Sequence, residues 1–166
     1  MPLYFAYGSN MDVEQMARRC PRSRPLGPAR LMRHRLAVMR EGWLTATRDP
    51  VAAVEGVLWE AALSDMRALD RYEGLGEGLY VKASQPVVAN GAPKRALIYF
   101  GANSGPGVAR PDYIAGVLRA ARHWRLSAAA IAQIERFAAL AGPASATIAA
   151  AAPRVRPRFA TPFDRD

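Results

Sequence analysis

The sequence contains few of the residues that build metal sites and disulfides. Its 166 residues include one cysteine, Cys20, and two histidines, His34 and His123. A single cysteine cannot form an intrachain disulfide or a multi-cysteine zinc site, and its scarcity is typical of proteins from a reducing cytoplasm. The histidines are isolated and lack the spacing of a metal-binding pair. We therefore expect no metal and no other cofactor.

Long apolar runs and an export signal are also missing. No stretch approaches the roughly 18 consecutive apolar residues that a membrane-spanning helix needs. The first residues, Met1–Tyr4, do not form a basic segment followed by an apolar run and a cleavage site. Half of the chain is hydrophobic, 51%, which favours a folded protein over a disordered one. These features predict a soluble, unexported, cytoplasmic protein that has no membrane partner.

Lysine is scarce, and arginine supplies most of the positive charge. The chain has 23 basic and 14 acidic residues, a formal net charge of +9, and its only lysines are Lys82 and Lys94. Between residues 18 and 40 eight arginines occur without one acidic residue. One interpretation is a surface that binds a polyanion. The other is compositional, since arginine in place of lysine is typical of GC-rich coding sequences. The arginines spread over several segments without a nucleic-acid motif, which favours the second interpretation.

The patterns of apolar residues and turn residues predict a mixture of strands and helices. Strands are expected over residues 3–7, 34–39, 43–47, 54–59, 79–83, 86–89 and 95–100. Helices are expected over residues 12–19, 64–72, 112–124 and 127–140. This order predicts one α+β domain, residues 1–142, with a mixed, largely antiparallel sheet that is open or closed into a barrel. Residues 143–166 are expected to form a C-terminal tail of unassigned structure.

Local signals give further expectations for the connections. Residues 21–28, which hold three prolines, are expected to be irregular, and residues 101–111 to form a loop. The dipeptide Asn90-Gly91 predicts a hairpin turn. Gly56 lies inside an expected strand and indicates a bulge or a close backbone approach. Ser64, Asp112 and Ser127 are expected to cap the helices that they open.

The first candidate functional motif is Tyr7-Gly8-Ser9-Asn10. It joins the end of a strand to a short helix through a glycine. Such a junction presents backbone N–H groups to an anion or to a developing oxyanion. The glycine lets a ligand approach the backbone because it has no Cβ. The alternative is an ordinary turn in which Ser9 or Asn10 caps the helix.

The second candidate motif surrounds Glu73. It reads Leu69-Asp70-Arg71-Tyr72-Glu73-Gly74 and is followed by Gly78-Leu79-Tyr80. The motif puts a carboxylate just after a helix and next to a glycine. A partly shielded carboxyl group there would have its pKa raised into a range that suits proton transfer. The alternative is a solvated acid at a helix terminus.

Together the two motifs resemble those of the γ-glutamylcyclotransferase family (GGCT-like, AIG2-like). Residues 3–10, Leu-Tyr-Phe-Ala-Tyr-Gly-Ser-Asn, are similar to its N-terminal signature, and residues 69–80 are similar to the segment that carries its catalytic glutamate. The residues Pro111-Asp112-Tyr113 and Arg125-Leu126-Ser127 precede two helices, as in the family's C-terminal part. The resemblance covers roughly residues 3 to 140, in the same order and at the same spacing.

The resemblance implies a fold and a set of roles. The fold would be a small mixed β-barrel with flanking helices. Glu73 would be the catalytic general acid and base. The residues that match substrate-binding positions are Tyr4, Ala6, Tyr7, Gly8, Ser9, Asn10, Tyr80 and Tyr113. For Tyr80 and Tyr113, packing at the core or rim is the alternative.

The resemblance also implies a reaction, whose chemistry needs few residues. A γ-glutamyl amide carries its own nucleophile, the α-amine, which can attack the side-chain carbonyl and close a five-membered ring. Glu73 would take a proton from the ammonium group and pass it to the departing amine. The products would be 5-oxoproline and an amine or amino acid. The turn amides would bind either the oxyanion or the α-carboxylate.

Ser9-Asn10 after the glycine places the chain nearest the family branch that acts on γ-glutamyl amino acids. The glutathione-degrading branch resembles Tyr-Gly-Ser-Leu, and the γ-glutamylamine branch resembles Tyr-Gly-Thr-Leu-Lys. An alternative is a cyclotransferase for γ-glutamylamines or for γ-glutamyl protecting groups. From another class, the alternative is a basic polyanion-binding module without catalysis. The expected partner is a small γ-glutamyl substrate, nucleic acid is not expected, and the oligomeric state is not predicted.

Overall fold

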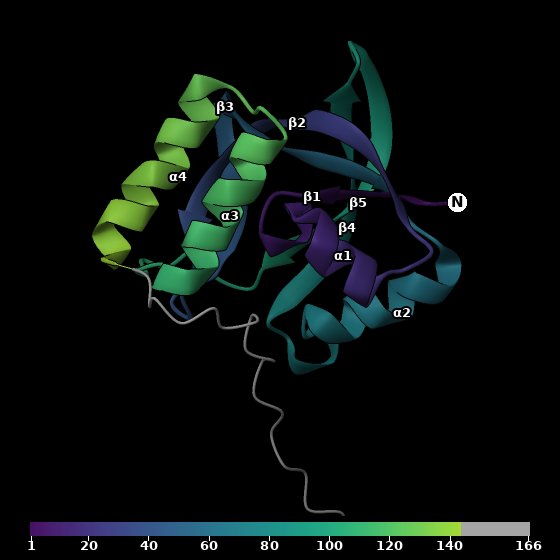
Figure 1. Ribbon diagram of the computed structural model, residues 1–166, viewed down its shortest axis with the longest axis horizontal. Helices are drawn as coiled ribbons and strands as arrows, with labels where there is room; N and C mark the ends of the chain where they lie inside the picture. The colour runs from purple at the N-terminus through teal and green to yellow at the C-terminus, as the bar shows by residue number, and fades with distance from the viewer. Residues whose placement is uncertain (144–166) are drawn as a thin grey trace, which may run out of the picture.

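A computed structural model describes residues 1–143 of the chain, and most of the expected tail lies outside these residues. The strands and helices follow one another along the chain, with two short 3₁₀ helices, η1 and η2, among them (Figure 1). Their bounds are β1 Leu3–Ala6, η1 Ser9–Met11, α1 Val13–Arg19, β2 Arg24–Val38, β3 Leu44–Glu60, α2 Leu63–Tyr72, η2 Leu75–Glu77, β4 Tyr80–Ala89, β5 Ala92–Gly101, α3 Pro111–His123 and α4 Ala128–Ala141. None of these helices is both long enough and apolar enough to cross a membrane.

The strands form a closed barrel in the order β1-β3-β2-β4-β5. All neighbouring strands are antiparallel except β1 and β5, which pair in parallel where Tyr4 lies opposite Leu97. Figure 1 shows α3 and α4 side by side on one flank of the barrel, and α1 and α2 together on another. The expected mixed, largely antiparallel barrel with flanking helices is therefore confirmed, in its closed form.

Strands β2 and β3 form one long hairpin, and here the sequence-based boundaries were wrong. The expected irregular segment, residues 21–28, enters β2 at Arg24, and the strands expected over 43–47 and 54–59 are parts of the single strand β3. The ladder tolerates the prolines because its register shifts between Pro25 and Gly27, and again between Met32 and His34. Strand β4 likewise runs without a break through both segments expected there.

The same hairpin accounts for part of the arginine-rich segment. Three arginines of β2 face acidic residues of β3 across the strands, and the pairs are Arg24 with Glu60, Arg30 with Glu55, and Arg35 with Asp49. Each arginine side chain is more than half exposed, 54–68%, so solvent screens these pairs and each adds little to the stability of the fold. These three arginines therefore support strand pairing, which weakens the case for a polyanion-binding surface.

The turn and capping signals had mixed outcomes. The hairpin turn at Asn90-Gly91 is confirmed, with both residues at positive φ, 51° and 74°. Ser127 caps α4 by accepting a hydrogen bond from the backbone of Ala130. Ser64 does not cap α2, because that helix already begins at Leu63.

Asp112 does not cap α3 either. Helix α3 begins one residue earlier, at Pro111, and Arg110 occupies the capping position. Proline is favoured at the first position of a helix because it needs no hydrogen-bond partner for its nitrogen and its φ is already helical. Asp112 therefore lies in the acidic first turn of α3.

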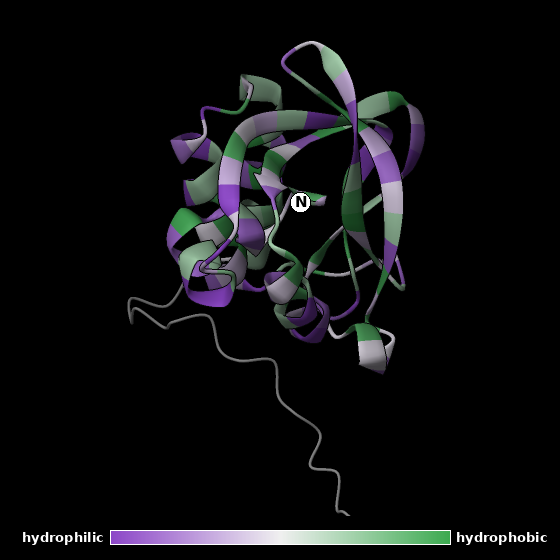
Figure 2. Cartoon of the chain, turned by 90° about the vertical axis from the view of Figure 1, so that its right-hand side faces the viewer, coloured by the Kyte–Doolittle hydropathy of each residue, from purple (hydrophilic) through white to green (hydrophobic). Residues whose placement is uncertain are grey.

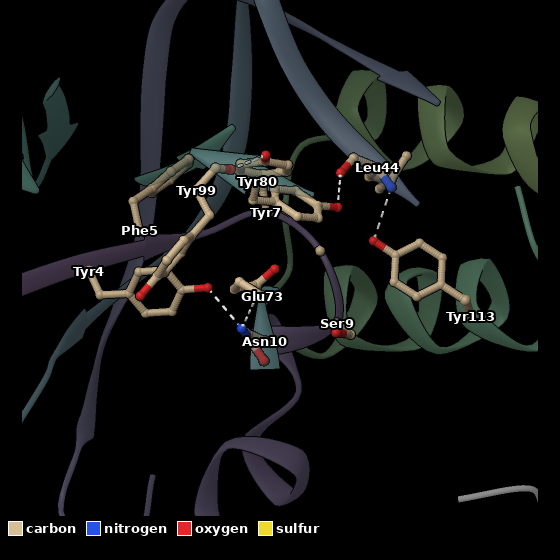
Figure 3. Close-up of a pocket in the computed structure, with 11 residues that line it drawn as sticks. Tyr4, Phe5, Tyr7, Ser9, Asn10, Leu44, Glu73, Tyr80, Tyr99 and Tyr113 are labelled. Carbon is tan, nitrogen blue, oxygen red and sulfur yellow. Dashed lines mark hydrogen bonds between the residues drawn. The ribbon is translucent and has the colours of Figure 1, made fainter. Parts of the chain in front are cut away.

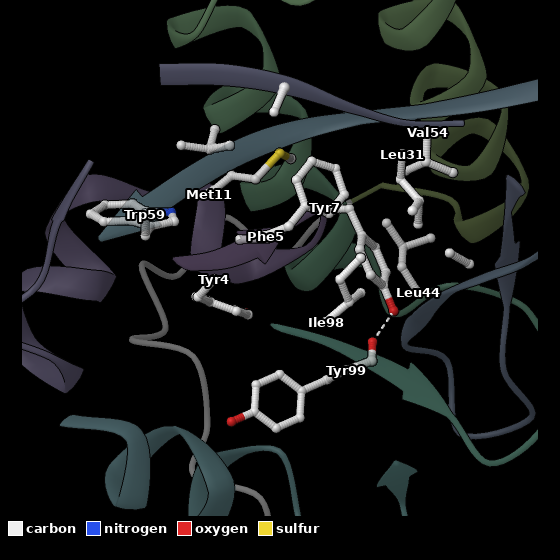
Figure 4. Packing of buried hydrophobic residues seen from close by; sticks show 14 of the residues in the cluster. Tyr4, Phe5, Tyr7, Met11, Leu31, Leu44, Val54, Trp59, Ile98 and Tyr99 are labelled. Carbon is white, nitrogen blue, oxygen red and sulfur yellow. Dashed lines mark hydrogen bonds between the residues drawn. The ribbon is translucent and has the colours of Figure 1, made fainter. Parts of the chain in front are cut away.

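The hydrophobic core is built by apolar side chains from all five strands and from the adjoining helices, and Figure 4 shows part of it. Along β2 the exposed and buried residues partly alternate, and Figure 2 shows the corresponding change between hydrophilic and hydrophobic bands along the strands. Gly56 lies where β3 meets β1, and a Cβ there would be 2.2 Å from the carbonyl oxygen of Ala6. The close backbone approach expected at this glycine is therefore confirmed.

Candidate active site

A pocket lies beside the end of β1 and the end of α2 (Figure 3). Elements that are distant in the sequence contribute to its walls. The lining residues are Tyr4, Phe5, Tyr7, Gly8, Ser9, Asn10, Leu44, Glu73, Tyr80, Tyr99 and Tyr113.

The two sequence motifs meet in this pocket. Asn10 Nδ2 donates a hydrogen bond of 2.9 Å to Glu73 Oε1, across 63 positions of sequence. The predicted catalytic residue and seven of the eight predicted substrate-binding residues line the pocket. Ala6 is the exception. It is buried inside β1, where its backbone packs against Gly56, and its methyl group does not reach the cavity.

Glu73 is held at the pocket by the end of α2. It occupies the C-cap position of that helix, and its backbone N–H donates to the carbonyl of Leu69 at 2.8 Å. Gly74 follows with φ 64°, a left-handed conformation that lets the chain turn away sharply. Glu73 is only 7% exposed, so its carboxyl group is not a solvated acid at a helix terminus. Figure 3 shows its carboxyl group among the pocket side chains.

Asn10 links the carboxylate to the phenol of Tyr4. The Asn10 side chain is buried, and Nδ2 donates to both Tyr4 Oη and Glu73 Oε1, each at 2.9 Å. Its carbonyl Oδ1 accepts a hydrogen bond from Arg19 Nη1. Neither Ser9 nor Asn10 caps η1, since Gly8 holds that position without a side-chain bond. The side-chain hydrogen bonds of Asn10 therefore go to Tyr4, Glu73 and Arg19 and not to the backbone of η1.

The glycine of the first motif keeps space open in the pocket. Gly8 precedes η1, whose first backbone N–H groups have no partner within the helix. A Cβ on Gly8 would lie 2.8 Å from Tyr113 Oη. A side chain at this position would therefore collide with a tyrosine of the pocket wall.

Three tyrosines of the pocket form hydrogen bonds with the backbone of strands β3 and β5. Tyr80 Oη donates to the carbonyl of Leu44 at 2.8 Å, and Tyr113 Oη accepts from the backbone N–H of Leu44 at 3.2 Å. Tyr7 Oη donates to the carbonyl of Tyr99. Tyr80 and Tyr113 thus both border the cavity and contact β3, so the two interpretations of these residues apply together.

Burial and charge keep three of these phenols protonated. Burial, and next the negative charge of Glu73, raise the pKa of Tyr4 and of Tyr7 well above the usual 10. Burial, followed by the hydrogen bond to Asp70, raises the pKa of Tyr99 in the same way. Such phenols can donate hydrogen bonds but cannot act as bases near neutral pH. Glu73 is the only carboxylate among the lining residues and is the group suited to accept a proton.

Three lining residues were not predicted from the sequence: Phe5, Leu44 and Tyr99. Phe5 lies in the strand just before the first motif and carries no polar group that would suggest a role. Tyr99 lies in a strand, and its place in the site depends on barrel closure. The Tyr99 hydroxyl donates to Asp70 Oδ1 at 2.6 Å. Asp70, which belongs to the second motif, therefore helps to orient the Tyr99 side chain at the pocket. Burial opposes the charge of Asp70, but hydrogen bonds from Lys82 and Tyr99 lower its pKa overall.

The buried phenols predict a loss of stability at alkaline pH. In the unfolded chain a tyrosine ionises near pH 10, whereas Tyr4, Tyr7 and Tyr99 keep their protons in the fold. Above pH 10 each of the three should therefore lower the free energy of unfolding by about 1.4 kcal/mol per pH unit. Burial also raises the pKa of the Cys20 thiol to about 12, which adds a loss beginning near pH 9.

Urea unfolding followed at pH 8, 9, 10 and 11 measures this effect. In Tyr99→Phe the free energy of unfolding should fall less steeply above pH 10, by about 1.4 kcal/mol per pH unit, because one of the three phenols is then absent. A free energy of unfolding that is the same at pH 8 and pH 11 would contradict the prediction.

The family model described as "Gamma-glutamyl cyclotransferase, AIG2-like" matches residues 4–126. A human gamma-glutamylcyclotransferase is 34% identical over 89 residues, which cover 48% of this chain and 47% of the human protein. A Bos taurus gamma-glutamylcyclotransferase is 35% identical over 89 residues, which again cover 48% of this chain and 47% of that protein. The chain thus spans about half the length of the curated relatives it matches.

The fold is also similar to that of several solved structures. One described as "Gamma-glutamyl cyclotransferase" has a TM-score of 0.76 and 26% identity, covering 81% of this chain and 86% of that chain. A Homo sapiens protein described as uncharacterized, loc79017, also has a TM-score of 0.76 and 26% identity, with coverage of 87% and 90%. YkqA from Bacillus subtilis has a TM-score of 0.72 and 26% identity, covering 83% of this chain and 54% of that chain.

Proposed function

The chain belongs to the AIG2-like gamma-glutamyl cyclotransferase family, and we propose that it converts γ-glutamyl amino acids to 5-oxoproline and a free amino acid. The observation that carries the proposal is the buried Glu73 carboxylate, held by Asn10 in the same pocket as the Tyr7–Asn10 turn. A carboxylate in that place can meet the ammonium group of a substrate whose γ-carbonyl lies against the turn.

In the proposed reaction the substrate supplies both reacting groups. Its α-ammonium gives a proton to Glu73, and the neutral amine attacks the γ-carbonyl carbon. A new C–N bond closes the five-membered ring, and the bond from that carbon to the leaving nitrogen breaks. The protonated Glu73 returns its proton to the leaving nitrogen. The ring nitrogen, which holds two hydrogens after the attack, gives up one of them, and this second proton also passes through Glu73 to the leaving amine. The products are then 5-oxoproline with one ring N–H and an amino acid with a protonated amine, and the carboxylate is regenerated without any other reactant.

The pocket walls support this role for Glu73. The phenols of Tyr4, Tyr7 and Tyr99 remain neutral, so they do not compete with the acid for the ammonium proton. The backbone N–H groups at the start of η1 are available to donate hydrogen bonds to an anionic part of the substrate, either the oxyanion or the α-carboxylate. The aromatic walls exclude water around the bound γ-glutamyl group, which strengthens both interactions.

A panel of substrates tests the proposal through release of 5-oxoproline. We expect the purified protein to act faster on γ-glutamyl amino acids than on γ-glutamylamines or glutathione. An N-acetylated γ-glutamyl amino acid is the matched control, because it lacks the free amine and should give no product. Faster release from γ-glutamylamines would favour the alternative branch. Absence of 5-oxoproline from every γ-glutamyl compound would refute the proposed activity.

A further inference from the structure

The side-chain amide of Asn10 is oriented so that its NH₂ group, not its carbonyl oxygen, faces Glu73. It presents Nδ2 to Tyr4 Oη and Glu73 Oε1, while its carbonyl Oδ1 points to Arg19 at the end of α1. If the amide were turned over, its carbonyl oxygen would face the carboxylate and the phenol oxygen instead. Two acceptors would then meet at Glu73, and the carboxylate would lose a donor.

Arg19 imposes this orientation because a guanidinium group only donates hydrogen bonds. It accepts nothing from Asn10, so only the carbonyl end of the amide can face it. Arg19 does not line the pocket and contacts the site from behind Asn10.

Several contacts hold the Arg19 side chain in place. Arg19 Nη2 donates to Gln15 Oε1 at 2.6 Å, one helical turn earlier in α1. The guanidinium carbon lies 3.7 Å from the centre of the Tyr72 ring, which belongs to the residue just before Glu73. Arg19 Nη1 also lies 3.4 Å from Ser9 Oγ in the first motif. Arg19 therefore contacts both halves of the candidate site.

From these contacts we infer that Arg19 is a positioning residue for the catalytic carboxylate. Arg19 fixes the side-chain amide of Asn10 so that the NH₂ group of Asn10 donates to Glu73. Through its contacts with Asn10 and with Tyr72, Arg19 also holds the Tyr7–Asn10 turn against the end of α2. This inference rests on the proposed function, because the role is to hold Glu73 ready for proton transfer. Arg19 itself contacts no substrate.

The adjacent Arg18 offers a matched control. Its side chain is 68% exposed, and its one ion pair, with Glu14, has a distance of 4.0 Å. Replacing either arginine with methionine removes the same charge from the same helix. Only the replacement of Arg19 removes the contacts with Asn10 and Tyr72.

The experiment compares kcat and KM of Arg19→Met, Arg19→Lys and Arg18→Met with those of the wild type. For Arg19→Met we expect kcat to fall about 10- to 100-fold, as for loss of a hydrogen bond to a charged group, while KM changes less than about threefold. Arg19→Lys should recover part of the loss because it keeps a cationic donor. Arg18→Met should match the wild type. A kcat for Arg19→Met equal to that of Arg18→Met would overturn the inference.

A double-mutant cycle shows whether Arg19 acts through Asn10. In an Asn10→Ala background, Arg19→Met should cause little further loss of kcat, because the orientation that it controls is already gone. An undiminished loss in that background would overturn the inference.

Gln15→Ala removes the hydrogen bond that supports Arg19, and it provides a second variant. Its kcat should also fall, but less than that of Arg19→Met. A wild-type protein inactive on the whole substrate panel would refute the proposed function itself, whereas an active wild type with unaffected Arg19 variants would refute only this inference.

Discussion

Replacing Glu73 with glutamine is expected to lower kcat by about 10²- to 10⁴-fold, the range that general acid–base catalysis contributes. Glutamine has nearly the same shape as glutamate, and its side-chain oxygen can still accept the hydrogen bond from Asn10 Nδ2. A neutral amide cannot take a proton from the α-ammonium of the substrate, nor return one to the leaving amine. The other lining residues include no second carboxylate that could replace it.

The measurement is the rate of 5-oxoproline release from the best substrate of the panel, at saturating concentration. Glu77→Gln is a matched control, because Glu77 is an exposed acid in η2, four residues further along the chain. It should have wild-type kcat, and the unfolding temperature of both variants should lie close to that of the wild type. If Glu73→Gln and wild-type protein cyclise the substrate equally fast, Glu73 is not the proton-transfer residue.

The individual residues of the site were largely predictable, but their mutual contacts were not. Tyr7–Asn10 and Glu73 each lie in a short contiguous motif, so residue type and spacing were enough to single them out. The hydrogen bond between Asn10 and Glu73 joins residues 63 positions apart and exists only because the fold brings η1 to the end of α2. Arg19 was one of many arginines in the sequence. Only its position behind Asn10 distinguishes it from Arg18.

The fold shows the same division between local and distant effects. The Asn90-Gly91 turn was predictable because two positive φ angles are a local demand that few residues meet. The full length of β2 and β3 was not, since two prolines and a glycine interrupt the pattern of β2, and one proline and one glycine interrupt that of β3. The ladder absorbs these residues through register shifts, and that adjustment depends on the partner strand. The caps expected at Ser64 and Asp112 failed for a local reason, because both helices begin earlier.

Gly56→Ala should be among the most destabilising substitutions in the barrel. The new Cβ would lie 2.2 Å from the carbonyl oxygen of Ala6 and 2.9 Å from Phe5 Cζ. The nearest atom belongs to the backbone of β1, which cannot turn aside as a flexible side chain could, so β1 must move away from β3. Overpacking of this kind costs about 3 kcal/mol, which corresponds to a fall in Tm of about 6–12 °C for a chain of this size.

The displacement should also reach the site, because Ala6 is followed directly by the Tyr7–Asn10 turn. A shift of about 1 Å in a residue that positions substrate can lower the rate about 10²-fold, so kcat should fall even at temperatures where the variant remains folded. Thermal unfolding and 5-oxoproline release measure the two effects. Gly76→Ala is the matched control: Gly76 is exposed, a Cβ there meets nothing within 4 Å, and the variant should be as stable and active as the wild type. If Gly56→Ala unfolds at the same temperature as Gly76→Ala, the close contact between β1 and β3 does not constrain the barrel as argued.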